Sequence, residues 1–254
     1  MNCKNIYHKH ILEAKDFLLK NQIQDLHRLH PAYGHKRISI ALNICKSRII
    51  RVMHKFNLKP PRRKIKRFYT TRSVNQTSYT NIIKNIEAKF PSQIYVSDLT
   101  YIKHQGKFIY LGTVEDIFTR EVISADLSIK HDSNLVLSVV KLALDKSIPD
   151  IFHTDQGSEF MAQSVTSFLE SNNVRVSVSD KGSPWQNGFK ESFYSRFKDE
   201  NGDLNRFEDL GELIEEIYSY INYYNKYRIH TSLKMSPYQF KQNLSESCLE
   251  NMGT

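Results

Sequence analysis

The first sixty residues place apolar and basic positions at helical spacing. Residues 7–20 predict one helix, because apolar side chains recur there every three to four positions. Residues 35–43 and 46–58 predict two further helices separated by a short break. The last of these has an apolar stripe opposite Arg48 and Arg51. Two short helices joined by a tight turn, with basic residues on the second, are typical of a helix-turn-helix module.

The helical pattern stops at residue 60. Pro60 and Pro61 cannot continue a helix, since proline lacks the amide hydrogen and clashes with the preceding turn. The polar stretch that follows has neither a helical nor a strand period. We therefore expect a helical, helix-turn-helix-like DNA-binding region over 1–59 and a basic linker over 60–90.

From residue 91 the pattern changes to strands that alternate with helices. In order, it predicts three strands, a helix, a strand, a helix, a strand and a helix at 94–102, 110–116, 122–128, 134–146, 150–154, 159–169, 174–178 and 189–200. The short connections between the first three strands favour antiparallel pairing. This order is expected of an α/β, ribonuclease-H-like domain with a five-stranded mixed sheet and flanking helices.

A strongly amphipathic helix is predicted after this domain, at 207–225, and we expect it to pack on the domain. We assign 91–200 to a catalytic core and 201–240 to the amphipathic helix and a closing motif. The polar composition of 241–254 predicts a frayed, flexible tail.

The charge distribution adds a class of partner. Residues 1–90 hold 20 Lys and Arg against 4 Asp and Glu, whereas residues 91–254 hold 16 against 23, for a net charge of +9. A solvated basic face is one explanation. We favour contact with DNA or RNA, because the basic residues alternate with apolar helix formers along the whole arm. The candidates for this contact are Lys36, Arg37, Arg48, Arg51, Arg62 and Arg63.

Three scattered cysteines imply no disulfide framework, which fits a reducing cytosol. No apolar run approaches the roughly 18 to 20 residues that span a bilayer, and the first ten residues lack the apolar segment of a secretory signal. We expect a cytoplasmic, nucleoid-associated protein with no membrane partner.

Three carboxylates stand in distinctive settings: Asp98 in YVSDLTYI, Asp155 in HTDQGSEF and Glu191 in GSPWQNGFKESF, the last two separated by 35 residues. They lie on the core-facing side of the first strand, at the end of the fourth strand and on a later helix. Two-metal phosphoryl transfer needs carboxylates that hold two divalent cations about 3.5 to 4 Å apart, and oxygen ligands suit Mg²⁺ or Mn²⁺. Each carboxylate, taken alone, is most simply explained as a structural group that is hydrogen-bonded within the fold. The triple, in a compatible order of elements, predicts a metal site.

Four other carboxylates are left outside this site. Glu115 and Asp116 end a predicted strand, and Asp180 fits a turn. Glu159 is placed in the first turn of a helix, where the helix dipole alone favours an acid.

On these motifs the chain resembles the integrase-core DDE transposases of bacterial insertion sequences, whose catalytic protein is the second of two overlapping reading frames and whose core is similar to retroviral integrase. The resemblance covers roughly residues 30–240. YGHKRISIAL with RIIRVMHKFNL resembles the family's helix-turn-helix segment, DLTYI, HTDQGSEF and KGSPWQNGFKESF resemble its catalytic blocks, and YINYYNKYRIHTSLKMSPYQF resembles its closing motif.

The resemblance implies that Asp98, Asp155 and Glu191 bind two Mg²⁺ or Mn²⁺ ions. It also implies that the protein cleaves and joins DNA strands at element ends and in target DNA, without a covalent protein–DNA intermediate. The implied partners are DNA, further copies of the same chain on that DNA, and the product of an upstream overlapping frame.

Several neighbours of the triad have two open roles. Lys198 lies two helical turns after Glu191, where it could meet the phosphate backbone or be an ordinary surface lysine. Trp185 could stack on a base or pack against the body of the protein, and Asn187 could cap the helix or touch DNA. His153 could orient Asp155 or be a satisfied packing histidine.

The closing motif contains four polar or aromatic positions that fit either phosphate contacts or a buried polar network. We favour the network, which would staple the closing motif to the core through Tyr224, Asn225, Arg228 and His230.

The favoured hypothesis is therefore an active transposase that performs metal-dependent DNA strand cleavage and strand transfer. A catalytically silent DNA-binding remnant or regulator of transposition is the first alternative. A ribonuclease-H-like nuclease acting on hybrids or junctions is the second.

Overall fold

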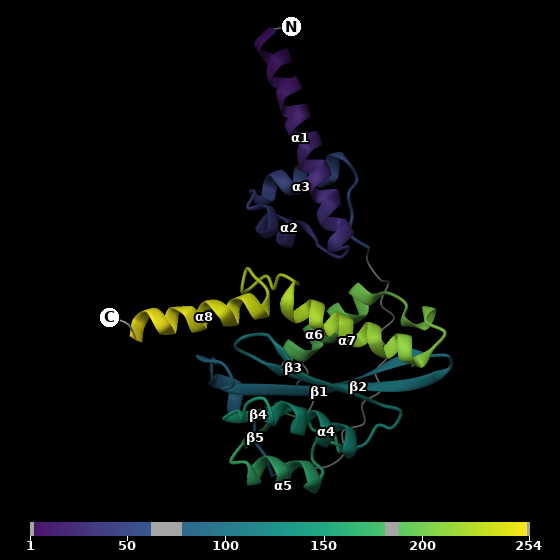
Figure 1. The fold of residues 1–254 in the computed structure, drawn as a ribbon, viewed down its shortest axis with the longest axis vertical. Helices are drawn as coiled ribbons and strands as arrows, with labels where there is room; N and C mark the ends of the chain where they lie inside the picture. Colours follow the sequence, from purple (N-terminus) through teal and green to yellow (C-terminus); the bar gives the residue numbers. More distant parts are fainter. Residues whose placement is uncertain (1–2, 62–77, 181–187, 253–254) are drawn as a thin grey trace. The chain divides into compact units, whose positions relative to one another are not determined.

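The computed structural model describes residues 3–61, 78–180 and 188–252 (Figure 1). The chain divides into two compact units. A helical unit comprises residues 1–65 and 228–235, and a sheet-containing unit comprises residues 66–227 and 236–254. Within the described parts of the chain, none of the helices has both the length and the apolar character required to cross a bilayer.

The helical unit contains α1 (Cys3–Leu29), α2 (His35–Leu42) and α3 (Lys46–Lys55). The two short helices predicted at 35–43 and 46–58 are confirmed, and the turn between them passes through Asn43 in the left-handed conformation, with φ 51°. The first helix is much longer than the predicted 7–20, because Leu19 and Ile23 continue its buried stripe. The core of the unit consists of Leu19, Ile23, Tyr33, Ile38, Ile49, Val52 and Met53.

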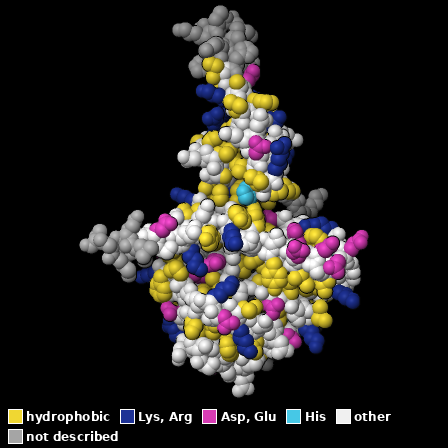
Figure 2. All heavy atoms as spheres, in the orientation of Figure 1, with side chains coloured by type: hydrophobic (Ala, Val, Ile, Leu, Met, Phe, Trp, Pro, Cys, Tyr) yellow, Lys and Arg dark blue, Asp and Glu magenta, His cyan; other side chains and the backbone are white. Residues whose placement is uncertain are grey.

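The exposed surface of α1 also carries large apolar residues. Leu12, Phe17 and Leu18 are each more than half exposed. Apolar side chains stand among the charged ones on the visible surface of both units (Figure 2).

Residues 228–235 belong to the helical unit although they come late in the chain. The Ile229 amide donates to the Tyr33 hydroxyl at 2.7 Å, and the Ile229 carbonyl accepts from Arg37 Nε at 2.9 Å. Arg228 is buried, and His230 forms an antiparallel bridge with Met235. The structure thus groups Arg228 and His230 with the N-terminal helices, and the network that would staple them to the catalytic core stays a prediction.

The second unit is built on a five-stranded mixed sheet, as predicted. The strand order is β3-β2-β1-β4-β5; β2 pairs antiparallel with both β1 and β3, and β4 pairs parallel with both β1 and β5. The strands are β1 (Ile94–His104), β2 (Lys107–Asp116), β3 (Val122–Ser128), β4 (Ile151–Thr154) and β5 (Arg175–Val178).

Helices cover both faces of this sheet (Figure 1). On one face α4 (Ser133–Leu144) and α5 (Gln163–Ser171) enclose a core around Tyr95, Val139 and Phe152. On the other face α6 (Gly188–Asn201) and α7 (Leu210–Lys226) enclose a second core around Ile102 and Phe193. Two 3-10 helices complete the unit, η1 (Ile82–Asn85) and η3 (Leu204–Arg206). This architecture confirms the α/β, ribonuclease-H-like fold.

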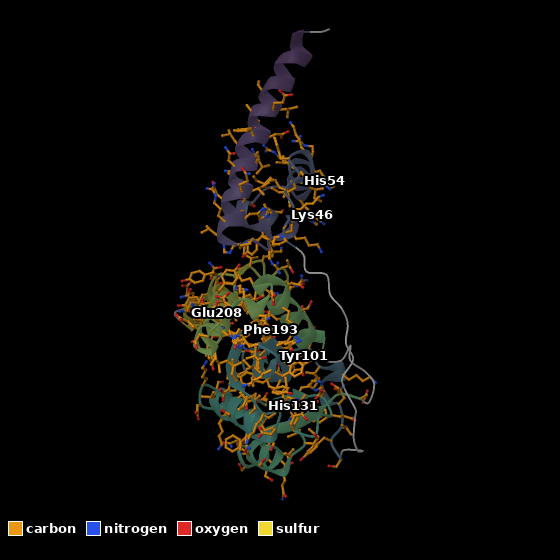
Figure 3. All side chains as sticks on the ribbon, turned by 90° about the vertical axis from the view of Figure 1, so that its right-hand side faces the viewer. Lys46, His54, Tyr101, His131, Phe193 and Glu208 are labelled. Atoms are coloured by element: carbon orange, nitrogen blue, oxygen red, sulfur yellow. The ribbon has the colours of Figure 1, made fainter. Side chains whose placement is uncertain are left out.

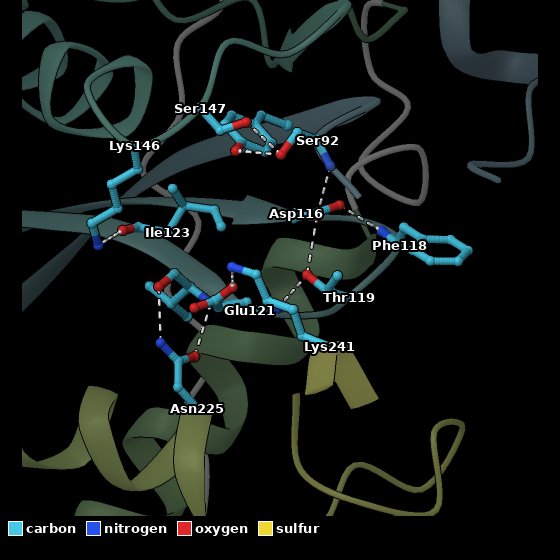
Figure 4. A network of polar contacts seen from close by, with 12 residues as sticks. Ser92, Asp116, Phe118, Thr119, Glu121, Ile123, Lys146, Ser147, Asn225 and Lys241 are labelled. Carbon is cyan, nitrogen blue, oxygen red and sulfur yellow. Dashed lines mark hydrogen bonds and ion pairs between the residues drawn. The ribbon is translucent and has the colours of Figure 1, made fainter. Parts of the chain in front are cut away.

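Polar contacts attach the C-terminal helices to the sheet (Figure 4). Asn225 of α7 pairs with both backbone groups of Val122, each at 2.9 Å. Lys241 of α8 (Pro237–Met252) forms a 2.9 Å ion pair with Glu121. The helix α8 extends as far as Met252, through most of the segment 241–254 for which the sequence predicted a flexible tail.

Candidate active site

The pairing of β1 with β4 places Asp98 and Asp155 on the same face of the sheet. These strands run parallel, with Val96 opposite His153. Each aspartate lies two residues beyond that pair, and side chains alternate between faces along a strand. Neighbouring strands are about 4.8 Å apart. The register therefore places Asp98 and Asp155 at the same level of two neighbouring chain segments, although they lie far apart in sequence.

Backbone amides hold both carboxylates. Asp98 Oδ1 accepts from the Leu99 amide at 2.8 Å, and Asp155 Oδ1 accepts from the Gly157 amide at 2.9 Å. A Cβ atom at Gly157 would lie 3.0 Å from Asp155 Oδ1 and 2.8 Å from Glu159 Oε1, so a larger residue here would require the Asp155 and Glu159 side chains to shift. Burial raises the pKa of the Asp155 carboxyl, and the charge of Glu159 adds to that rise while His131 opposes it.

Glu159 is closer to this site than the sequence suggested. It lies four residues before α5, so the helix-dipole argument used to set it aside does not apply. Its Oε1 lies 3.2 Å from His131 Nε2, and the His131 ring lies 4.9 Å from the ring of Tyr110. His131 is labelled in Figure 3. Glu159 is therefore a neighbour of Asp155, and its carboxylate contacts the imidazole ring of His131.

The helix that carries Glu191 is attached directly to the strand that carries Asp98. Glu191 is the fourth residue of α6, and its side chain lies outside the described part of the structure. Tyr194 follows one turn later, is buried, and donates its hydroxyl to the Asp98 carbonyl oxygen at 2.5 Å. The same hydroxyl lies 2.9 Å from Thr113 Oγ1. The second turn of α6 is thus held over β1 beside Asp98.

Sequence reasoning did not identify Tyr194. The available signal was its position three residues after Glu191, which puts both residues on one face of the helix. Burial, followed by the nearby charge of Asp98, raises the pKa of the Tyr194 phenol well above its ordinary value. The phenol therefore stays protonated and remains a donor.

His153 is a satisfied packing histidine. It is fully buried, its Nδ1 lies 2.9 Å from Ser177 Oγ, and its Nε2 lies 3.0 Å from Ser179 Oγ. Burial lowers its pKa to about 4, so the ring is neutral near pH 7. Both ring nitrogens are engaged away from Asp155, which decides between the two roles left open by the sequence.

The remaining acids that the sequence set aside have other contacts. Asp116 is buried and accepts from the Ser92 amide at 2.9 Å, the Phe118 amide at 2.8 Å and the Thr119 hydroxyl at 3.0 Å (Figure 4). Asp180 lies on the surface, 3.6 Å from Lys84 Nζ.

Glu115 is buried near Arg120. Burial lowers the pKa of the Arg120 guanidinium, and the charge of Glu115 opposes that effect. The buried carboxylate of Glu115 and the half-buried guanidinium of Arg120 therefore compensate each other electrostatically.

The structure places some of the predicted DNA-contacting residues in internal interactions. Arg51 forms two hydrogen bonds, of 2.7 and 2.5 Å, to the buried carboxylate of Asp16. Arg37 is bonded to the Ile229 carbonyl. Lys198 Nζ lies 4.8 Å from the centre of the Tyr101 ring. Two other candidates lie on described helices, Lys36 on α2 and Arg48 on α3. The remaining candidates lie outside the described residues: Arg62, Arg63, Trp185 and Asn187.

The donor set on the sheet fits a hard divalent cation. Asp98 and Asp155 supply oxygen atoms only, which Mg²⁺ and Mn²⁺ prefer, and the nearby nitrogen donor His153 is occupied by serines. Among the side chains that the structure describes, no three His, Cys, Asp or Glu residues gather closely enough to hold a metal. Glu191, whose side chain is outside that set, begins the helix fixed beside Asp98.

The family models and the similar proteins indicate the same family. Two integrase core domain families match residues 88–184 and 172–237. The transposase for insertion sequence element IS904 of Lactococcus lactis is 30% identical over 237 residues, covering 89% of this chain and 94% of that protein. The putative transposase InsK for element IS150 of Escherichia coli is 29% identical over 248 residues, covering 92% of this chain and 87% of that protein.

Two solved structures are also similar. The HTLV-2 integrase catalytic core domain in complex with magnesium is 19% identical, with a TM-score of 0.47, and the match covers 61% of this chain and 99% of that one. The simian T-cell lymphotropic virus intasome in complex with PP2A regulatory subunit B56 gamma is 15% identical, with a TM-score of 0.49, covering 85% and 73%. On the integrase core matches and the near full-length similarity to the IS904 protein, the chain belongs to the integrase-core transposases of bacterial insertion sequences.

Proposed function

We propose that this transposase is a DDE-type polynucleotidyl transferase that cleaves and joins DNA strands at insertion-sequence ends. The observation that supports the proposal is the register of β1 and β4, in which Asp98 and Asp155 each follow the pair of Val96 and His153 by two residues. The hydrogen bond from Tyr194 supports it, because it fixes the helix of Glu191 beside the first of these carboxylates.

In this proposal Asp98, Asp155 and Glu191 hold two Mg²⁺ or Mn²⁺ ions. The bound ions supply activation of the attacking oxygen and stabilisation of the leaving oxygen. The role of the protein's own residues is to position the carboxylates. The amides of Leu99 and Gly157 orient the two aspartates, and the sheet and α6 bring three distant chain segments to one place. No protein nucleophile is required, so no covalent protein–DNA intermediate forms.

The substrate is DNA, at the ends of the element and in the target. The excess of basic residues in the first ninety positions supports this assignment, because Lys and Arg neutralise phosphates. We propose that the protein works as a homo-oligomer on DNA and that the product of an upstream frame is a further partner. The alternatives of a silent DNA-binding regulator and a ribonuclease-H-like nuclease gain no support from the structure or the family.

The proposal is tested with Asp155→Asn, which keeps the size of the side chain and removes the charge needed by a metal. We expect strand cleavage at the sequences that flank the gene to be lost with Mg²⁺, while binding to the same DNA in a gel-shift assay is retained. Asp180→Asn is the matched control, because Asp180 is a surface acid in a weak ion pair. Cleavage by Asp155→Asn at the wild-type rate would rule out the proposed site.

A further inference from the structure

The hairpin that joins β1 and β2 exposes two aromatic side chains together. Tyr101 and Phe108 are 36% and 49% exposed, and their rings meet edge to face with centres 5.4 Å apart. Isolated exposed apolar residues are common on protein surfaces and need no explanation. A contacting aromatic pair at the end of a hairpin is a larger exposed apolar surface, and such surfaces often mark binding sites.

This pair continues along the sheet toward Asp155. Tyr101 lies opposite Tyr110 in the β1–β2 pairing, and the Tyr110 ring lies 4.9 Å from the ring of His131. His131 contacts Glu159, whose charge influences Asp155. We call these four rings the aromatic strip: Phe108, Tyr101, Tyr110 and His131. Figure 3 labels Tyr101 and His131, the second and last members of the strip.

Cationic side chains accompany the strip. Lys198 reaches from α6 to place its ammonium 4.8 Å from the centre of the Tyr101 ring. Lys103 lies opposite Phe108 in the strand pairing, so its side chain leaves the same face of the sheet, and it is exposed. Planar rings interleaved with cations suit unpaired nucleic acid, because bases stack on the rings while phosphates meet the charges.

The spacing along the chain relates the strip to the proposed metal site. Tyr101 follows Asp98 by three strand residues, which is about 10 Å along β1, and its side chain leaves the opposite face of the sheet. Lys198 follows Glu191 by seven helical residues, which is also about 10 Å. The contact of Lys198 with the Tyr101 ring therefore links the strip to the helix that carries Glu191.

We propose that the aromatic strip is a stacking platform for the bases of an unpaired DNA strand. This inference rests on the proposed function for the identity of the nucleic acid as DNA. The platform reads no particular sequence, because every base presents a flat face to an aromatic ring.

The test uses the full-length protein and a mixed-sequence single-stranded oligodeoxynucleotide of about 20 nucleotides carrying one 2-aminopurine, long enough for such a site. Binding of the wild-type protein should quench the fluorescence of 2-aminopurine by stacking. Tyr101→Ala should bind about 5- to 100-fold more weakly and lose the quenching. Tyr101→Phe, which keeps the ring, should behave like the wild type.

Tyr218→Ala is the matched control, because Tyr218 on α7 is 42% exposed and lies outside the strip. Phe108→Ala is a second variant and should also weaken binding. Wild-type affinity and quenching in Tyr101→Ala would overturn the inference. A change in oligomeric state with unchanged DNA affinity would overturn it too, because the strip would then be a protein interface.

The two proposals fail separately. If the wild-type protein cleaves DNA and Tyr101→Ala binds the oligonucleotide normally, the proposed function stands and the stacking platform is wrong. If Tyr101 is required for quenching but the wild-type protein cleaves no DNA, the platform stands and the strand-transfer proposal is wrong.

Discussion

The hydroxyl of Tyr194 donates a 2.5 Å hydrogen bond to the carbonyl oxygen of Asp98. This contact joins the second turn of α6 to the middle of β1, two segments that lie nearly a hundred residues apart. Because Glu191 lies one turn before Tyr194, the bond fixes where that turn stands over the strand. Tyr194 is therefore a positioning residue for the proposed site.

Tyr194→Phe should fold and bind DNA but cleave it more slowly. The substitution leaves the Asp98 carbonyl without this donor and costs about 1 kcal/mol of stability. If α6 is held less firmly, the apparent Mg²⁺ requirement for cleavage should rise, which a purely structural loss would not cause. Single-turnover cleavage measured over a range of Mg²⁺ concentrations checks this expectation.

Tyr220→Phe is the control for that variant. Tyr220 belongs to the same buried cluster, but its hydroxyl bonds Glu200 at 3.0 Å. An equal change in Mg²⁺ requirement for both variants would show that Tyr194 has no special positioning role.

Lys198→Ala should weaken binding to double-stranded DNA and make it less sensitive to salt. Each phosphate contact releases counterions, so losing one contact lowers the slope of log affinity against log salt by about one. Lys198→Arg should keep the wild-type slope. Lys226→Ala, on the exposed end of α7, serves as the comparison. An unchanged slope for Lys198→Ala would make Lys198 an ordinary surface lysine.

The buried Asp16 should make the helical unit sensitive to acid. Arg51 chiefly, with Lys55, lowers the pKa of Asp16 from 3.8 to about 2, against the opposing effect of burial. A carboxyl whose pKa is depressed by folding stabilises the protein above its unfolded pKa, and that stabilisation is lost as pH falls through the folded value. The contribution is therefore complete above about pH 4 and lost toward pH 2.

Thermal unfolding of the wild type and Asp16→Asn measures this effect. The wild type should unfold at the higher temperature near neutral pH, and the difference should shrink as the pH falls from about 4 to 2. A difference that stays constant over this range would contradict the assignment of the depressed pKa to Asp16.

Tyr33→Phe should loosen residues 228–235 from the helical unit. The Ile229 amide loses its 2.7 Å bond to the phenol, so its exchange with deuterium should accelerate by about 5- to 10-fold, as expected for the loss of about 1 kcal/mol. Tyr238→Phe, on an exposed position of α8, should leave that exchange unchanged. Equal exchange in Tyr33→Phe and the wild type would show that the bond does not hold this segment.

Local patterns predicted the elements well where a periodicity was strong. Alternation placed Asp98 on the inward face of its strand, and the helical period identified α4 and α7. The structure adds the pairing of β1 with β4, which no local pattern specifies because the two strands are separated by more than forty residues. Tyr194 was missed for the same reason, since its acceptor lies on a distant strand.

At two places the structure differs from what the local sequence suggested. The polar residues after 240 suggested a loose end, but Lys241 is attached to Glu121 and the helix continues. Glu159 was assigned to a first helical turn, but the helix begins four residues later and the carboxylate stands beside Asp155. In both cases a tertiary contact outweighed a preference that holds for isolated segments.

The return of residues 228–235 to the helical unit has a consequence for synthesis on the ribosome. A chain emerging from its N-terminus displays α1, α2 and α3 long before Ile229 exists to bond Tyr33 and Arg37. Domains usually fold in the order in which they are made. Here the first unit can be finished only after residues 66–227 of the second have been translated, so most of the sheet-containing unit is synthesised while the N-terminal unit is still incomplete.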